Sequence, residues 1–248
     1  MHDNDIALKI FSGENSLSTA IQFNGFPREG LDFLQDLRTN NNKAWFEAHR
    51  TLYENCLVTP ARAFIMEMGR RLQTIAPDII FDPRTDRSLF RIYRDVRFSK
   101  NKAPFKEHLG ILFWEGSAPK LQCSGFYFQL EPDNMMLAAG LYEFTSDLLQ
   151  RYRAAIMNEK QADKLMKALQ QIQGAGKDYV VSGDQYKRVP HGYDPNYQYA
   201  RLLLFKSLGV IMQIPLPEQV HSADLPDFCL AHFKNMLPLH RWLVEMTA

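Results

Sequence analysis

The residues best suited to bind a ligand or transform it are concentrated in one segment, from Arg84 to His108. This segment holds eight Lys or Arg and three Asp or Glu, a local charge of +5, whereas the chain of 248 residues carries a formal net charge of +1. Aromatic side chains lie between the cations, and a single carboxylate, Asp95, is set among three arginines. Because guanidinium and ammonium groups bind phosphate and carboxylate, the segment predicts a site for a negatively charged ligand.

Two local geometries would bring the arginines of this segment together. In a strand over residues 90–98, alternate side chains share a face, and Asp95 would lie between two guanidinium groups and orient them for bidentate contact. That face holds Arg91, Tyr93, Asp95 and Arg97. In a helix, Arg91, Arg94 and Arg97 would share a face instead. The loop that follows, residues 99–104, adds two lysines beside the arginines in either case.

The candidate ligand-binding residues come from this block and from two tyrosines of the later strands, which either line the same polar face as the arginines or reach water at the rim of the sheet. They are Arg91, Tyr93, Arg94, Arg97, Lys100, Lys102, Lys106, Tyr127 and Tyr142. The weaker candidates for a general acid or base are Asp95, Glu107 and His108. A structural alternative stands beside this interpretation, since arginines that flank an aspartate often form an internal ion-pair network while neighbouring lysines face water.

The elements that must position the block follow from hydrophobic periodicity, caps and turn residues. We predict helices that run from Pro27 to the Asn40–Asn42 segment and over residues 43–55, 59–75, 147–157, 159–172, 196–206 and 225–246. Asn42, Thr59 and either Thr145 or Ser146 are the expected N-caps. We predict strands over residues 109–114, 123–130, 135–141, 179–181 and 210–214, with a hairpin turn at residues 131–134.

This order of elements predicts an α+β fold, with a mainly antiparallel central sheet surrounded by several helices. No regular alternation of strand, helix and strand is apparent, which argues against a parallel sheet. We expect residues 1–22 to be an N-terminal extension and residues 23–248 to form a single α+β domain. The basic block would then lie at one edge or end of the sheet.

Composition excludes several classes of protein. Hydrophobic residues at 46% and charged residues at 23% are typical of a globular chain. The three cysteines are far apart and the seven histidines are scattered, so neither a disulfide framework nor a metal site is predicted. No phosphate-binding loop, dinucleotide fingerprint or nucleophile elbow occurs, and we predict no cofactor. With no secretory signal and no long apolar run, we expect a cytoplasmic protein without a membrane partner.

Several longer motifs resemble those of the DUF2461 family, a group of uncharacterised conserved bacterial proteins. The matching segments are residues 91–106 (RIYRDVRFSKNKAPFK), 40–46 (NNNKAWF), 140–142 (GLY) and 187–193 (KRVPHGY), within a resemblance that covers roughly Phe23 to Val244. The last of these segments adds Arg188 to the candidate ligand-binding residues. This chain departs from the family pattern at His191 and at Tyr197-Gln198, which weakens the expectation of anion binding by that loop. The resemblance implies no established activity.

Three hypotheses from different functional classes follow. The first is an enzyme that acts on a small phosphorylated or carboxylated substrate, whose anion the arginines would clamp. The second is a non-catalytic interaction or scaffold protein in which the arginine-rich block is structural. The third is a nucleic-acid-binding module, with Lys100, Lys102 and Lys106 on phosphates and Tyr93 or Phe105 stacked on bases. The near-neutral charge of the chain makes nucleic acid the less favoured partner compared with a small anion.

Overall fold

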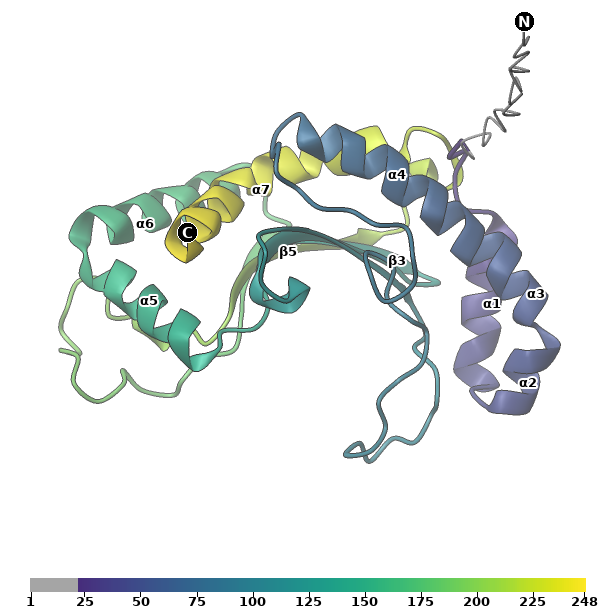
Figure 1. Cartoon of the computed structure of the whole chain (residues 1–248), viewed down its shortest axis with the longest axis horizontal. Coiled ribbons are helices and arrows are strands. Elements are labelled where there is room, and N and C mark those ends of the chain that lie inside the picture. The colour runs from purple at the N-terminus through teal and green to yellow at the C-terminus, as the bar shows by residue number, and fades with distance from the viewer. Residues whose placement is uncertain (1–21) are drawn as a thin grey trace, which may run out of the picture.

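The computed structural model describes residues 22–248, and its centre is a five-stranded antiparallel sheet (Figure 1). Its strands are β1 (Leu109–Glu115), β2 (Ser124–Leu130), β3 (Asn134–Leu141), β4 (Tyr179–Ser182) and β5 (Leu208–Pro215). They lie in the order β1-β2-β3-β5-β4. All five expected strands are confirmed within a few residues at their ends. The predicted N-terminal extension lies outside the described residues, apart from Gln22.

Seven α-helices accompany the sheet in the described residues, which confirms the α+β class. They are α1 (Arg28–Thr39), α2 (Lys43–Ala48), α3 (Arg50–Tyr53), α4 (Thr59–Gln73), α5 (Ser146–Met157), α6 (Glu159–Gly174) and α7 (Leu225–Thr247). Four short elements join them: the π-helical η1 (Glu54–Val58) and the 3₁₀ turns η2 (Lys120–Gln122), η3 (Leu202–Leu204) and η4 (Glu218–His221). Within residues 22–248, no helix combines the length and the apolar character needed to cross a bilayer.

Helices cover one face of the sheet and leave the other face open. In Figure 1, α4 and α7 lie above the strands, and α7 packs directly on β2 and β3. Alternation along β2 explains this arrangement, because Phe126 and Phe128 are fully buried under the helices while Tyr127 and Gln129 point the opposite way and are only half-buried. The main apolar core therefore lies between the sheet and the helices, and a small second cluster of Leu112, Trp114 and Cys123 lies on the other face.

Local cap chemistry set several helix starts as expected. The side chain of Asn42 accepts a hydrogen bond from the Trp45 amide at 3.0 Å, and that of Thr145 accepts one from the Leu148 amide at 3.3 Å. Thr59 is not an N-cap, because Val58 before it is already helical and η1 continues directly into α4. The chain thus crosses from α3 to α4 without a break.

Residues 90–98 adopt neither of the two geometries considered for them, strand or helix, and their one pairing within the described chain is the isolated bridge of Tyr93 with Phe105. The chain leaves the edge of β1 after Ile92, projects away and returns at Pro104, so it pairs only with itself. The predicted helix over residues 196–206 is also absent. That segment has turns with hydrogen bonds from residue i to i−3, ending in η3.

Candidate functional site

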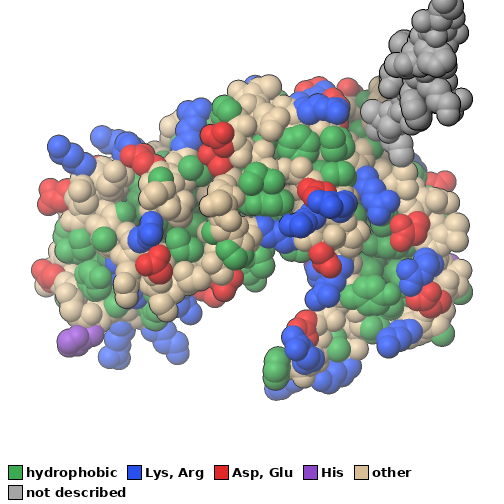
Figure 2. All heavy atoms as spheres, in the orientation of Figure 1, with side chains coloured by type: hydrophobic (Ala, Val, Ile, Leu, Met, Phe, Trp, Pro, Cys, Tyr) green, Lys and Arg blue, Asp and Glu red, His purple; other side chains and the backbone are tan. Residues whose placement is uncertain are grey.

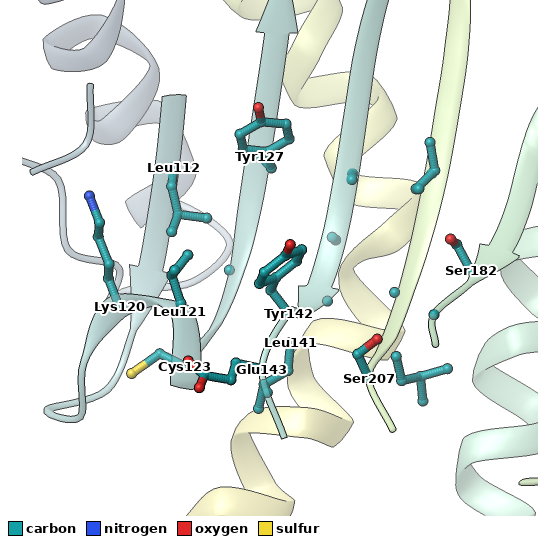
Figure 3. A pocket seen from close by; sticks show the side chains of 18 of the residues that line it. Leu112, Lys120, Leu121, Cys123, Tyr127, Leu141, Tyr142, Glu143, Ser182 and Ser207 are labelled. Carbon is teal, nitrogen blue, oxygen red and sulfur yellow. The ribbon is translucent and has the colours of Figure 1, made fainter. Parts of the chain in front are cut away.

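The open face of the sheet forms a pocket of about 1060 Å³. Figure 2 shows the molecule hollowed on this side, between the projecting segment and the part that contains α5 and α6. Antiparallel register places side chains from neighbouring strands on the same face, in rows that run across the sheet. The pocket floor consists of Leu112, Gly125, Tyr127, Gln129, Met136, Ala138, Gly140, Gly209 and Ile211 (Figure 3).

A basic wall closes the pocket beside β1. It consists of Phe90, Lys106 and Lys120, and it follows the edge of β1 because the Phe90 amide donates to the Gly110 carbonyl at 3.0 Å. The ring of Phe90 lies between two ammonium groups. Lys106 Nζ is 5.3 Å from the ring centroid and Lys120 Nζ is 4.3 Å from it. Both distances fall in the range of favourable cation–π contacts.

Backbone carbonyls hold both ammonium groups in place. Lys106 Nζ donates to the Arg91 carbonyl at 3.0 Å, and Lys120 Nζ donates to the carbonyls of Asp86 and Arg87 at 2.9 and 2.5 Å. Within residues 22–248 neither lysine forms an ion pair with an Asp or Glu. An ammonium group has three N–H donors, so two remain on Lys106 and one on Lys120 for a ligand.

Burial lowers the pKa of both lysines, since a charged group loses solvation in the pocket wall. The nearby Arg91 guanidinium lowers the pKa of Lys106 further. The Asp86 carboxylate acts in the opposite direction and raises the pKa of both lysines, which offsets part of the lowering. His108 also lines the pocket, and burial together with the Lys106 charge lowers its pKa below 6.5. Burial thus disfavours the charged form of all three groups in this wall.

A series of hydrogen bonds runs along β2 from Tyr127. The Tyr127 hydroxyl donates to Gln129 Oε1 at 2.7 Å, and Gln129 Nε2 donates to Glu131 Oε1 at 2.6 Å. Burial raises the pKa of the Tyr127 phenol, so it stays protonated and keeps this direction of donation. These contacts fix two polar side chains in a mostly apolar floor.

The opposite wall is built by Ser182 from β4 and by the segment that leads into β5. Ser207 Oγ accepts a hydrogen bond from the Asp184 amide at 2.9 Å, and Lys206 Nζ lies 5.4 Å from the Tyr186 ring centroid. Tyr142 follows the end of β3, and its side chain is 79% exposed in the pocket (Figure 3). The pocket thus has two lysines in one wall, and hydroxyl groups, the Lys206 ammonium and an open aromatic ring in the other.

Most of the predicted arginine and lysine residues lie outside the pocket, on a projecting arm formed by residues 93–105. Asn41 holds the base of the arm with hydrogen bonds to the Phe105 carbonyl and amide, and the Phe105 ring stacks on Phe46 at 4.2 Å. At the tip, Phe98 is 96% exposed. The arm carries Tyr93, Arg94, Asp95, Arg97, Lys100 and Lys102, and none of these side chains lines the pocket.

The three arginines do not converge on one point. Arg97 pairs with Asp95 at 2.6 Å and holds the pKa of that carboxyl at about 2, whereas Arg91 lies 4.0 Å from Asp86. Arg94 forms no ion pair with residues 22–248. Arg188 is exposed in the segment between β4 and η3, and Glu107 accepts a hydrogen bond from Asn41 at 3.2 Å; neither lines the pocket.

Of the predicted site residues, the fold gathers Lys106, His108, Tyr127 and Tyr142 around the pocket. Sequence reasoning missed several other lining residues, namely Phe90, Lys120, Gln129, Ser182, Lys206 and Ser207. Gln129 could have been predicted from the sequence, because alternation along the strand places it on the same polar face as Tyr127. Lys120 and Ser207 could not, because they lie in connections whose path is set only by tertiary packing.

The described residues contain no group of three or more His, Cys, Asp or Glu side chains arranged to hold a metal ion. The three cysteines are free thiols, and Cys123 is among the residues that line the pocket.

Comparison with known proteins adds the family. No curated protein matches the chain. A family model described as "Conserved hypothetical protein (DUF2461)" matches residues 29–242, which is most of the sequence and includes every element that builds the pocket. The chain therefore belongs to the DUF2461 family.

Proposed function

We propose that this protein binds a small phosphorylated or carboxylated compound on the open face of the sheet, with the anionic group at Lys106 and Lys120. The observation that carries the proposal is the pair of partly buried ammonium groups at the pocket wall. Each is fixed by backbone carbonyls, and neither is neutralised by a carboxylate of the described chain.

The arrangement favours an anion for two physical reasons. The three N–H donors left on the lysines match the acceptor oxygens of a phosphate or carboxylate. Partial burial also weakens solvent screening, so an anion gains more from each cation here than it would at an exposed lysine. The ammonium groups of Lys106 and Lys120 lie on the same aromatic ring and repel each other. A bound anion would offset this repulsion and stabilise both lysines in their charged forms.

The same wall can support catalysis on that ligand. The two ammonium groups can stabilise negative charge that develops on the anion, and neutral His108 can accept a proton. In this version of the proposal the lysines bind the anion, rather than the arginines to which the sequence first pointed.

The arginine-rich block favours a different role. The ion pairs of Arg97 with Asp95 and of Arg91 with Asp86 support the hypothesis that these arginines stabilise the arm and its junction with the sheet. Of the two rings expected to stack on bases in a nucleic-acid function, Phe105 is 1% exposed and has no free face, which leaves only Tyr93.

The test is to titrate the protein with inorganic phosphate and with phosphorylated and carboxylated metabolites, measured by calorimetry and by thermal stabilisation. Replacing either lysine, in Lys106→Gln or Lys120→Gln, is expected to weaken binding about 10-fold or more, because a charge-assisted hydrogen bond contributes about 1.5–3 kcal/mol. Raising the salt concentration should weaken binding only modestly, since the cations are partly buried.

The matched control is the pair Lys160→Gln and Lys167→Gln, which removes charge from exposed positions on α6. These variants should bind as the original protein does. If the control variants lose as much affinity for the anion as the wall variants do, the loss is explained by the net charge of the protein and not by a site at Lys106 and Lys120. Absence of binding by every anion tested would remove the proposal.

A further inference from the structure

We propose that the ligand is a nucleotide, in which the phosphate is joined through a sugar to a planar aromatic base that stacks beside Tyr142. This inference rests on the proposed function, because it takes the anion position at Lys106 and Lys120 as its starting point. It adds the chemical class of the remainder of the ligand, which the basic wall alone does not define.

The pocket contains a flat slot beside Tyr142. Register pairs Gly125 with Gly140 and Gly140 with Gly209, so three adjacent strands lack a side chain in the same row of the floor. Close backbone approach requires these glycines: a Cβ on Gly140 would lie 2.4 Å from the Gly209 Cα, and one on Gly125 would lie 2.2 Å from the Phe113 carbonyl oxygen. The result is a row without side chains that spans two strand spacings, about 10 Å, in which Gly125 is buried and Gly140 and Gly209 are half-buried.

Aromatic and apolar side chains border this slot. Tyr142 follows Gly140 by two residues and lies on the same face, about 7 Å along the strand. On the other side of the glycines, register aligns Tyr127, Ala138 and Ile211 in the next row. A planar ring placed there would stack against the exposed face of Tyr142 and cover the glycine floor. The 79% exposure of Tyr142 leaves that face available.

Polar groups lie next to the position that the edge of such a ring would occupy. Ser182 pairs in register with Gly209, at the far end of the glycine row. Ser207 accepts the Asp184 amide and keeps its own hydroxyl hydrogen to donate. Hydroxyl groups of this kind bind the donors and acceptors of a heterocycle. The apolar floor of Met136, Ala138 and Ile211 offers few partners to the many hydroxyls of a free sugar, which favours an aromatic ring.

The distance across the sheet fits the order of groups in a nucleotide. Lys106 and Lys120 lie at the β1 edge, and the slot is centred on β3, two strands away or roughly 10 Å. A sugar bridges a phosphate and a base over a span of this kind. The phosphate would meet the cationic wall while the base meets Tyr142.

The experiment compares adenosine monophosphate with ribose phosphate, adenosine and inorganic phosphate, by calorimetry on the whole chain. We expect adenosine monophosphate to bind roughly 5- to 150-fold more tightly than ribose phosphate, the gain that stacking of one base on an aromatic side chain gives. Tyr142→Ala should abolish this gain without changing the affinity for ribose phosphate, and Tyr142→Phe should retain it. Tyr93→Ala, which removes a partly exposed tyrosine outside the pocket, is the matched control.

The outcomes separate this inference from the proposed function. If ribose phosphate binds as tightly as adenosine monophosphate, and Lys106→Gln weakens both, then the anion site stands and the nucleotide inference is wrong. A preference for the nucleotide that survives in Tyr142→Ala also overturns the inference. If no phosphate compound binds, the nucleotide inference fails, and if the carboxylated compounds do not bind either, the proposed function fails with it. Guanosine, cytidine and uridine monophosphates then test which base the serine wall prefers.

Discussion

Ser124, His240 and Glu115 form a hydrogen-bonded chain on the helix-covered side of the sheet. Ser124 Oγ lies 2.9 Å from His240 Nδ1, and His240 Nε2 lies 2.9 Å from Glu115 Oε2. These are the residue types of a hydrolase triad, but Ser124 is fully buried and His240 is 1% exposed. A substrate cannot reach the serine. These hydrogen bonds are therefore structural, and they connect α7 to β1 and β2.

Removing the serine hydroxyl should destabilise the fold. In Ser124→Ala, one ring nitrogen of buried His240 loses its partner, which costs about 1–3 kcal/mol of unfolding free energy. Urea denaturation followed by circular dichroism measures the change. Ser117→Ala, at an exposed position in the turn after β1, should alter stability by less than about 0.5 kcal/mol. Equal stability of the two variants would contradict the structural role.

The histidines predict how stability responds to pH. Burial lowers the pKa of His108, His232 and His240 below the value of 6.5 for an unperturbed imidazole. Below pH 6.5 the unfolded chain therefore binds protons that the folded chain does not, and the free energy of unfolding should fall as the pH drops. We expect measurably lower stability at pH 5.5 than at pH 7.5 by urea denaturation. A flat profile across this window would be inconsistent with buried neutral histidines.

At the scale of elements, the arm depends on a contact from another part of the chain. Asn41, just before α2, donates to the Phe105 carbonyl and to Glu107 Oε1 and accepts from the Phe105 amide, at distances of 3.0–3.2 Å. Within the arm, hydrogen bonds between backbone groups join Arg94 to Pro104 and Ser99 to Val96, and the other bonds are made by exposed side chains. Its base is therefore held by the α1–α2 turn and by the stacking of Phe105 on Phe46.

Asn41→Ala should loosen the arm while leaving the sheet intact. Hydrogen exchange of the peptide that contains Phe105 is expected to accelerate about 10-fold, because the loss of these bonds lowers the local opening free energy by about 1–2 kcal/mol. Asn40→Ala is the control, since the Asn40 side chain bonds only within the end of α1. If both variants exchange at the original rate, Asn41 does not anchor the arm.

At the scale of the whole molecule, the two faces of the sheet have different tasks. One face carries the core and the other carries the pocket, and consecutive residues of β5 belong to opposite faces. Met212 is 1% exposed under the helices, whereas Ile211 lines the pocket. The free energy of folding should therefore depend strongly on one residue and weakly on its neighbour.

Met212→Ala should cost about 2–5 kcal/mol of unfolding free energy, the range for a large side chain removed from a packed core. Ile211→Ala should cost less than about 1.5 kcal/mol, because that side chain contributes to an open hollow. Both values come from urea denaturation under the same conditions. Similar losses in the two variants would mean that the open face is packed as a core.

Local sequence patterns were sufficient for most elements but not for the arm or the loop before β5. Alternation in Ser124–Leu130 and the caps at Asn42 and Thr145 act over a few residues, so they could be interpreted without knowledge of the fold. Residues 90–98 also alternate, yet they have no neighbouring strand with which to complete a ladder. A strand needs hydrogen bonds from elsewhere in the chain, and periodicity alone cannot supply them.

The sequence by itself determined the antiparallel sheet, the face of β2 that is buried, and the concentration of cations in mid-chain. Only the tertiary structure decided which cations face the pocket: Lys106 is turned to it, Lys120 joins from a separate connection, and the arginines are placed on or beside the arm. The reason is that the alternation of side chains between two faces is set by residues close together in the sequence. A pocket is set by the packing of segments that are far apart in the sequence. Convergence of distant groups is a property of the packed molecule.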